Sequence, residues 1–127
     1  MKRTLLPLAG ISLALCLAAG LVVADTNTIR TLTQITMNLD LHPSDADKAV
    51  LAAIIESDDS SEEEVALAMA LANMEQKVNA ADAERLLDIV DDDLSDESAR
   101  KLAAVLLRIN QRPSDQDRLT LSALLSD

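Results

Sequence analysis

The sequence predicts an all-α protein, built as a short α-solenoid of helical hairpins with a 35-residue repeat and six helices. Three observations lead to this prediction: the chain matches itself when it is shifted by 35 residues, apolar residues recur at helical spacing, and strand-like alternation is absent. A length of 127 residues allows one domain, which we assign to residues 25–127. We assign residues 1–24 to a signal peptide.

The first 24 residues have the layout of a secretory leader. Lys2 and Arg3 give a positive start, and residues 4–24 carry no charge. The residues that end this run, Val22 and Ala24, suit cleavage after Ala24. We therefore expect a periplasmic or secreted protein. Cleavage removes both basic residues of the leader and takes the formal charge from −11 to −13.

Two other interpretations of the leader stay open. The apolar run is long enough, at about 20 residues, to act as an uncleaved membrane anchor, although a proline and two glycines interrupt it. Residues 13–16, Leu-Ala-Leu-Cys, also resemble the lipobox of bacterial lipoproteins, which would make Cys16 the lipid-modified residue. Leu15 departs from that pattern, because the family has a small residue directly before the cysteine.

The internal repeat sets the order of the elements. Residues 44–77 overlay residues 79–112 without a gap, and 11 of the 34 aligned pairs are identical. Composition alone would give about three or four identical pairs. Residues 114–127 match residues 44–57 again. The mature chain is therefore expected to contain half a repeat, two whole repeats and another half.

Each whole repeat is expected to form two helices. The first begins beside a polar cap, Ser44, Asn79 or Ser114, whose side chain can accept a hydrogen bond from the first helical turn. The second begins near Ser60 or Ser95, 35 residues apart, and the half repeat begins near Asp25. In chain order the predicted helices are 27–40, 45–57, 61–76, 80–91, 96–110 and 115–125.

Stacked hairpins of this kind form a solenoid, in which each repeat buries its apolar face against the next. The period resembles that of tetratricopeptide repeats, although the glycine and large aromatic residues of that family's pattern are missing. In a solenoid the first and last helices have an open side, and Leu121 of the last helix would be exposed if Leu119, Leu124 and Leu125 face inward. We expect a partner, or a second copy of the chain in a homo-oligomer, to cover that side. The alternative is a closed six-helix bundle.

Two segments hold most of the negative charge. The first acidic segment, residues 56–64, and the second acidic segment, residues 88–97, contain six acids each and no base. Both cover the turn between the first and second helices of successive repeats, so we expect them side by side on one edge. The opposite edge carries His42, Lys77 and Arg112 at equivalent positions.

Composition excludes several kinds of function. The chain has no aromatic residue on which bases or sugars could stack, and it has no basic excess for nucleic acid. One His and one Cys cannot build a zinc site from several such ligands, and both glycines lie in the leader, so no phosphate-binding loop is available. We expect no catalytic residues, no cofactor and no metal site; His42, among Asp40, Asp45 and Asp47, is interpreted as a residue at a helix end.

We therefore expect a non-enzymatic module that binds another protein. The acidic edge would attract a partner with a basic patch, and the membrane would be met only through the signal peptide. The residues expected to contribute most are Asp58, Asp59, Asp91, Asp92 and Asp93. Two alternatives stay open: a Ca²⁺-responsive module that uses the same acids, and a structural periplasmic protein.

Overall fold

The computed structural model describes residues 26–126, and within them the chain is helical with no strand. The predicted class and the six predicted helices are confirmed. The predicted signal peptide, Cys16 included, lies outside the described residues. Across 26–126, none of the helices combines the length and apolar character needed to cross a membrane. The helices are α2 Thr26–Met37, α3 Asp45–Glu56, α4 Glu62–Ala72, α5 Ala80–Asp91, α6 Glu97–Arg108 and α7 Asp115–Ser126.

The helices α3, α5 and α7 begin where their caps predict. The Ser44 hydroxyl accepts a hydrogen bond from the Asp47 amide at 3.1 Å. The Asn79 side chain accepts one from the Asp82 amide at 2.8 Å. Ser114 does the same for Asp117 at 3.1 Å. Each cap satisfies a backbone N–H that the helix itself cannot pair.

The helices α4 and α6 begin one residue later than expected. Ser61 is the cap of α4, and it forms a reciprocal pair with buried Glu64: each side chain accepts from the other residue's backbone amide, at 3.1 and 2.8 Å. Ser60 instead donates its hydroxyl to the Ile54 carbonyl at 2.6 Å, so it closes the preceding helix. The Asp96 side chain caps α6 by accepting one hydrogen bond, from the Ala99 amide at 3.2 Å.

The helices α2, α4 and α6 end two to four residues before their predicted ends, at Met37, Ala72 and Arg108. The turns that follow contain Leu41, Gln76 and Gln111, which have φ of 73°, 76° and 77°. None of the three is glycine, so the sequence carries no local signal for these left-handed residues.

These three residues join through their backbones. The Leu41 amide donates to the Gln111 carbonyl at 2.6 Å, the Gln111 amide to the Gln76 carbonyl at 2.6 Å, and the Gln76 amide to the Leu41 carbonyl at 2.7 Å. We call this cyclic arrangement the turn ring. Each of the three turns therefore depends on the other two for its hydrogen bonds.

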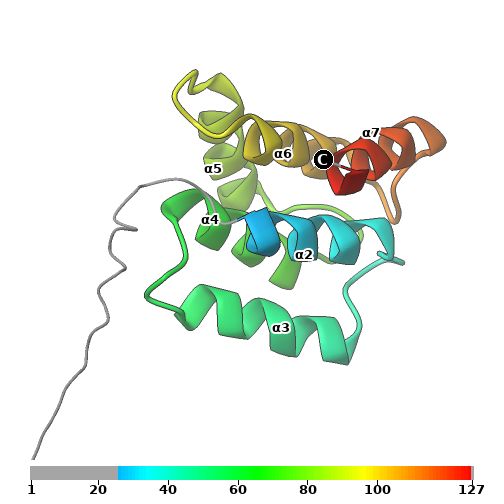
Figure 1. The fold of residues 1–127 in the computed structure, drawn as a ribbon. Helices are drawn as coiled ribbons and strands as arrows, with labels where there is room; N and C mark the ends of the chain where they lie inside the picture. The colour runs from blue at the N-terminus through cyan, green and yellow to red at the C-terminus, as the bar shows by residue number, and fades with distance from the viewer. Residues whose placement is uncertain (1–25, 127) are drawn as a thin grey trace, which may run out of the picture.

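The contacts between helices run in a closed circuit. The helix α3 packs on α4, α5 packs on α6, and α7 packs on α2, while α2, α4 and α6 also contact one another (Figure 1). The Arg30 guanidinium of α2 donates a hydrogen bond to the Leu125 carbonyl of α7. The first and last helices therefore cover each other, and the expectation of open end helices is wrong.

The burial of the last helix follows from this contact. Leu121 is fully buried, whereas Leu119 is 67% exposed, so Leu119 does not face inward and Leu121 is not the leucine that α7 exposes. The core contains Leu32, Leu67 and Leu102, one from each of α2, α4 and α6. Beside them lie small buried residues that let these three helices approach closely: Thr33, Ala68 and Ala103.

The closed contact between α7 and α2 can be tested by comparing Leu121→Ala with Leu119→Ala. Truncating the buried Leu121 is expected to lower the free energy of unfolding by about 2–5 kcal/mol, and truncating the exposed Leu119 to change it by less than about 0.5 kcal/mol. Urea unfolding followed by circular dichroism measures both. Equal effects of the two substitutions would contradict the packing described above.

The left-handed turns can be tested at Gln76. Gln76→Gly is expected to raise the free energy of unfolding by about 0.5–1 kcal/mol, because glycine has no Cβ to crowd its carbonyl at positive φ. Gln76→Val is expected to lower it by more than about 1 kcal/mol, since a branched side chain adds to that crowding. The control, Gln34→Gly on the exposed side of α2, should lower it by about 1 kcal/mol. Thermal unfolding curves of the three variants decide the order.

Candidate functional site

A groove of about 830 Å³ lies between the N-terminus of α4 and the C-terminus of α5. We call it the acidic groove. It is bounded by parts of both acidic segments, because its lining runs from Ser60 into α4 and from Arg85 to Ser95. The acids that line it are Glu62, Glu63, Asp88 and Asp92.

The two helices place these acids on opposite sides of the acidic groove. Glu62 and Glu63 lie in the first turn of α4, where the helix dipole favours negative charge. Asp88 lies in the last turn of α5, where the dipole opposes it. Asp92 ends α5 and accepts a hydrogen bond from the Leu94 amide at 2.9 Å, which holds the turn that follows. The acids at the end of α5 are therefore not explained by the stability of their own helix.

The acidic groove also has apolar walls. Half-buried Val65 and Ala66 of α4 line it, and so does Ile89 of α5, which is buried. Leu94 lines it from the tip of the second turn and is 94% exposed. The guanidinium of Arg85 lies 3.5 Å from the Met69 sulfur, and this residue also lines the groove. Apolar side chains and carboxylates thus line the same groove.

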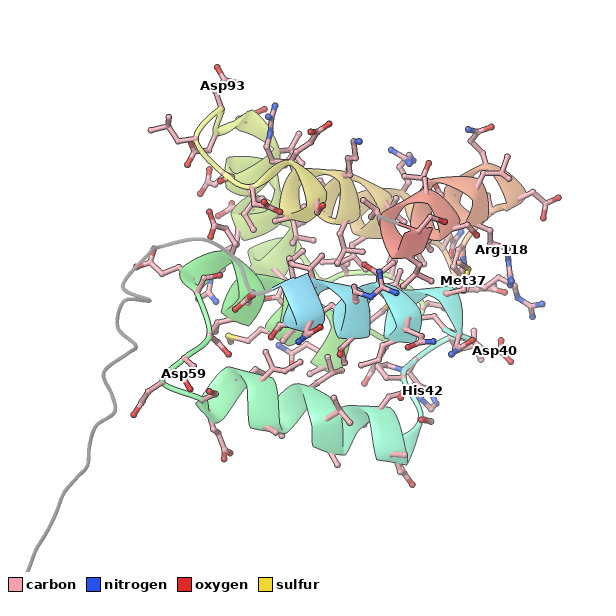
Figure 2. All side chains as sticks on the ribbon, viewed as in Figure 1. Met37, Asp40, His42, Asp59, Asp93 and Arg118 are labelled. Atoms are coloured by element: carbon pink, nitrogen blue, oxygen red, sulfur yellow. The ribbon has the colours of Figure 1, made fainter. Side chains whose placement is uncertain are left out.

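The five predicted partner-binding residues are all exposed, but they do not gather at one point. Asp59 and Asp93 lie at the same end of the molecule, at two well-separated corners (Figure 2). The two acidic segments nevertheless border one groove, which residues of both segments line, so the segments share one edge although Asp59 and Asp93 themselves stand apart. Asp92 is the member of the set that lines the acidic groove, whereas Asp58 and Asp91 do not.

Some acids at this end have partners of their own. The Asp93 carboxylate lies 3.7 Å from the Arg100 guanidinium, and the Asp59 amide donates to the Ser57 hydroxyl at 3.1 Å. These contacts order the two turns that flank the acidic groove.

The predicted basic positions lie at the other end of the helices. His42, Lys77 and Arg112 are exposed and directly follow the three residues of the turn ring. Arg112 pairs with Asp40 at 3.3 Å, and the His42 Nδ1 atom lies 2.8 Å from the Pro43 carbonyl oxygen. Figure 2 shows Asp40 and His42 far from Asp59 and Asp93. Within residues 26–126, no three His, Cys, Asp or Glu side chains come together as a metal ion would require.

Sequence reasoning missed several residues of the acidic groove. Glu62 and Glu63 belong to the first acidic segment but were not among the five residues expected to bind a partner, and Arg85 and Leu94 were given no role. One signal was available for Leu94: it is the apolar residue in a run of acids, and in the 35-residue register it stands where the first turn has Asp59. The sequence indicated that the two acidic segments lie on one edge, but it gave no signal for the groove between α4 and α5 or for its apolar lining.

A second groove lies between α2 and α3, with a volume of about 270 Å³. Its described lining residues correspond, 35 positions earlier, to residues of the acidic groove, yet none of them carries a charge. Where the acidic groove has Glu62, Glu63, Asp88 and Asp92, this neutral groove has Asn27, Thr28, Ala53 and Ser57. A hollow thus forms both between α2 and α3 and between α4 and α5, and the side chains make the second one acidic.

In the third pair of helices, α6 and α7, the equivalent acid has a basic partner on its own helix. Glu97 corresponds to Glu62, and the Lys101 ammonium lies 3.0 Å from the Glu97 carboxylate. The residue four positions after Glu62 is Ala66 instead.

Comparison of the chain with protein-family models, curated proteins and solved structures finds no match.

The Glu97–Lys101 pair gives a pH-dependent prediction. The hydrogen bond and the charge of Lys101 lower the pKa of the Glu97 carboxyl below its ordinary value. The small stabilisation that results is present above the unfolded-state pKa and is lost as the pH falls through the folded-state pKa. Lys101→Ala should return the pKa of Glu97 towards the ordinary value, as measured by NMR titration of the carboxyl carbon. Lys48→Ala, at the other end of the molecule, should leave that titration unchanged.

Proposed function

We propose that the protein is an exported, non-enzymatic module that binds another protein through its acidic end. We define the acidic end as the two turns between α3 and α4 and between α5 and α6, together with the acidic groove between them. The partner carries a basic patch. The observation that carries this proposal is the concentration of exposed carboxylates on both turns and on both sides of one groove.

The distribution of charge supports attraction over a distance. The two acidic segments together hold twelve acids and no base, and the turn-ring end carries His42, Lys77 and Arg112. Such an uneven field orients a basic partner before contact and raises its association rate. Exposed acids also improve solubility, but solubility does not require them to meet around an apolar groove.

The leader supports the exported location. A signal peptide at residues 1–24 would direct the domain to the periplasm or outside the cell. The mature chain lacks cysteine, so its stability there depends on packing rather than on disulfides. The two alternatives are retention at the membrane by an uncleaved leader and retention at the membrane by a lipid on Cys16. The mass of the protein recovered from the exported fraction distinguishes the three.

The proposal is tested by cross-linking in the exported compartment and by the association kinetics of the basic protein so captured. Charge reversal to Lys at Asp58, Asp59, Asp91, Asp92 and Asp93 is expected to slow association by about tenfold or more at low salt. The same variant should show a weaker dependence of the rate on salt, because the steering field is lost. All five residues are exposed, so the fold is expected to survive.

A control variant reverses the charge pattern at the other end. Arg112→Glu and Lys77→Glu change exposed residues near the turn ring and should not slow association with a basic partner. An association rate that is unchanged by the five substitutions at low salt would contradict the proposed function.

A further inference from the structure

The acidic groove combines features that together describe its occupant. Four carboxylates, two from α4 and two from the end of α5, line it together with apolar side chains of both helices and with Leu94, which is 94% exposed. Arg85 is the one basic residue among its described lining residues, so acids outnumber bases there by four to one. We infer that the acidic groove takes an amphipathic helix of the partner, with leucine-type residues along one face and Lys or Arg along both flanks. This inference rests on the proposed function and assigns it a particular site and ligand.

The size of the groove and the two helices that line it are compatible with a docked helical segment. Its walls come from the first turns of α4 and the last turns of α5, and the volume of about 830 Å³ is large enough for several side chains. A helix docked in such a groove presents residues at i, i+3, i+4 and i+7 to the apolar side chains of the groove. Its flanking residues then face Glu62 and Glu63 on one side and Asp88 and Asp92 on the other.

Leu94 has no role in holding the fold together. It is 94% exposed at the tip of its turn, where the equivalent position of the first turn holds Asp59. A leucine so placed among acids gains apolar contact once a partner covers it, and burial of its side chain favours the bound state. Together with half-buried Val65 and Ala66 it would form the apolar contact that decides how slowly the partner dissociates.

The neutral groove between α2 and α3 shows that the charges are not a by-product of the fold. A smaller hollow, of about 270 Å³, forms there at the equivalent positions, with Asn27, Thr28, Ala53 and Ser57 in place of the four acids. Because the hollow tolerates neutral residues, the carboxylates of the acidic groove are not required to build it. Their convergence therefore points to a cationic ligand with apolar residues between its charges.

The test uses the protein recovered from the exported fraction and a synthetic helical peptide of about 15 residues, with Leu on one face and Lys on both flanks. Two control peptides accompany it. One has the same composition in a scrambled order, which keeps the charge and removes the amphipathic pattern. The other replaces every Lys with Glu. Tight, saturable binding of the first peptide alone is expected, measured by fluorescence of a label on the peptide.

A matched pair of variants separates the groove from general attraction. Asp88→Lys with Asp92→Lys changes two acids that line the acidic groove, and Asp91→Lys with Asp93→Lys changes two neighbouring acids that do not. Both pairs alter the net charge equally, so both should slow association. The groove pair alone should also increase the dissociation rate, by about tenfold.

Leu94→Ser tests the apolar contact without disturbing the core. It is expected to weaken the peptide by about tenfold or more, while Leu119→Ser, at an exposed leucine of α7, should leave the affinity unchanged. Equal dissociation rates for the two charge pairs, or no effect of Leu94→Ser, would overturn the inference.

The scrambled peptide separates the two proposals. If it binds as well as the ordered peptide and the five-Asp variant still slows association, the assigned ligand is wrong and the proposed function stands. If neither cationic peptide binds and the five-Asp variant associates normally with the captured partner, both proposals are wrong.

Discussion

The turn ring is the interaction on which the rest of the structure depends. Leu41, Gln76 and Gln111 each hold a left-handed conformation, donate a backbone hydrogen bond to one of the other two and accept one from the third. Each turn therefore pairs its backbone groups with those of the other two turns. The ring ties the turn after α2 to the turns after α4 and α6, in a fold in which α7 also contacts α2 and Leu121 is buried.

Two hollows at equivalent places in the fold are lined by different side chains. The hollow between paired helices appears in two hairpins, yet acids line it in one and neutral residues in the other. In the third hairpin the acid equivalent to Glu62 is paired with Lys101. Similar backbones thus carry three different charge patterns. Such divergence is typical of repeated units in which packing constrains the buried positions and leaves the exposed ones free to vary.

The accuracy of the sequence predictions depends on how local each signal is. The starts of α3, α5 and α7 were predicted correctly, because a cap and its amide lie three residues apart. The starts of α4 and α6 were wrong by one residue, since neighbouring side chains can both cap and Ser60 is used by the Ile54 carbonyl. The ends of α2, α4 and α6 were missed because their left-handed turns contain no glycine. The sequence shows the acids of the candidate site as two runs, but it does not show that four of them line one groove together with Ile89 and Leu94.

The sequence by itself determined the helical class, the number of helices and the caps that start three of them. These depend on residues within about four positions of one another, which a pattern reveals directly. The tertiary structure alone decided that the end helices meet, that Leu121 rather than Leu119 is buried, and that α4 and α5 enclose the acidic groove. The reason is that these features depend on contacts between residues far apart in the sequence, such as the contact of α7 with α2 and the backbone bonds among the three turn residues, which no local pattern encodes.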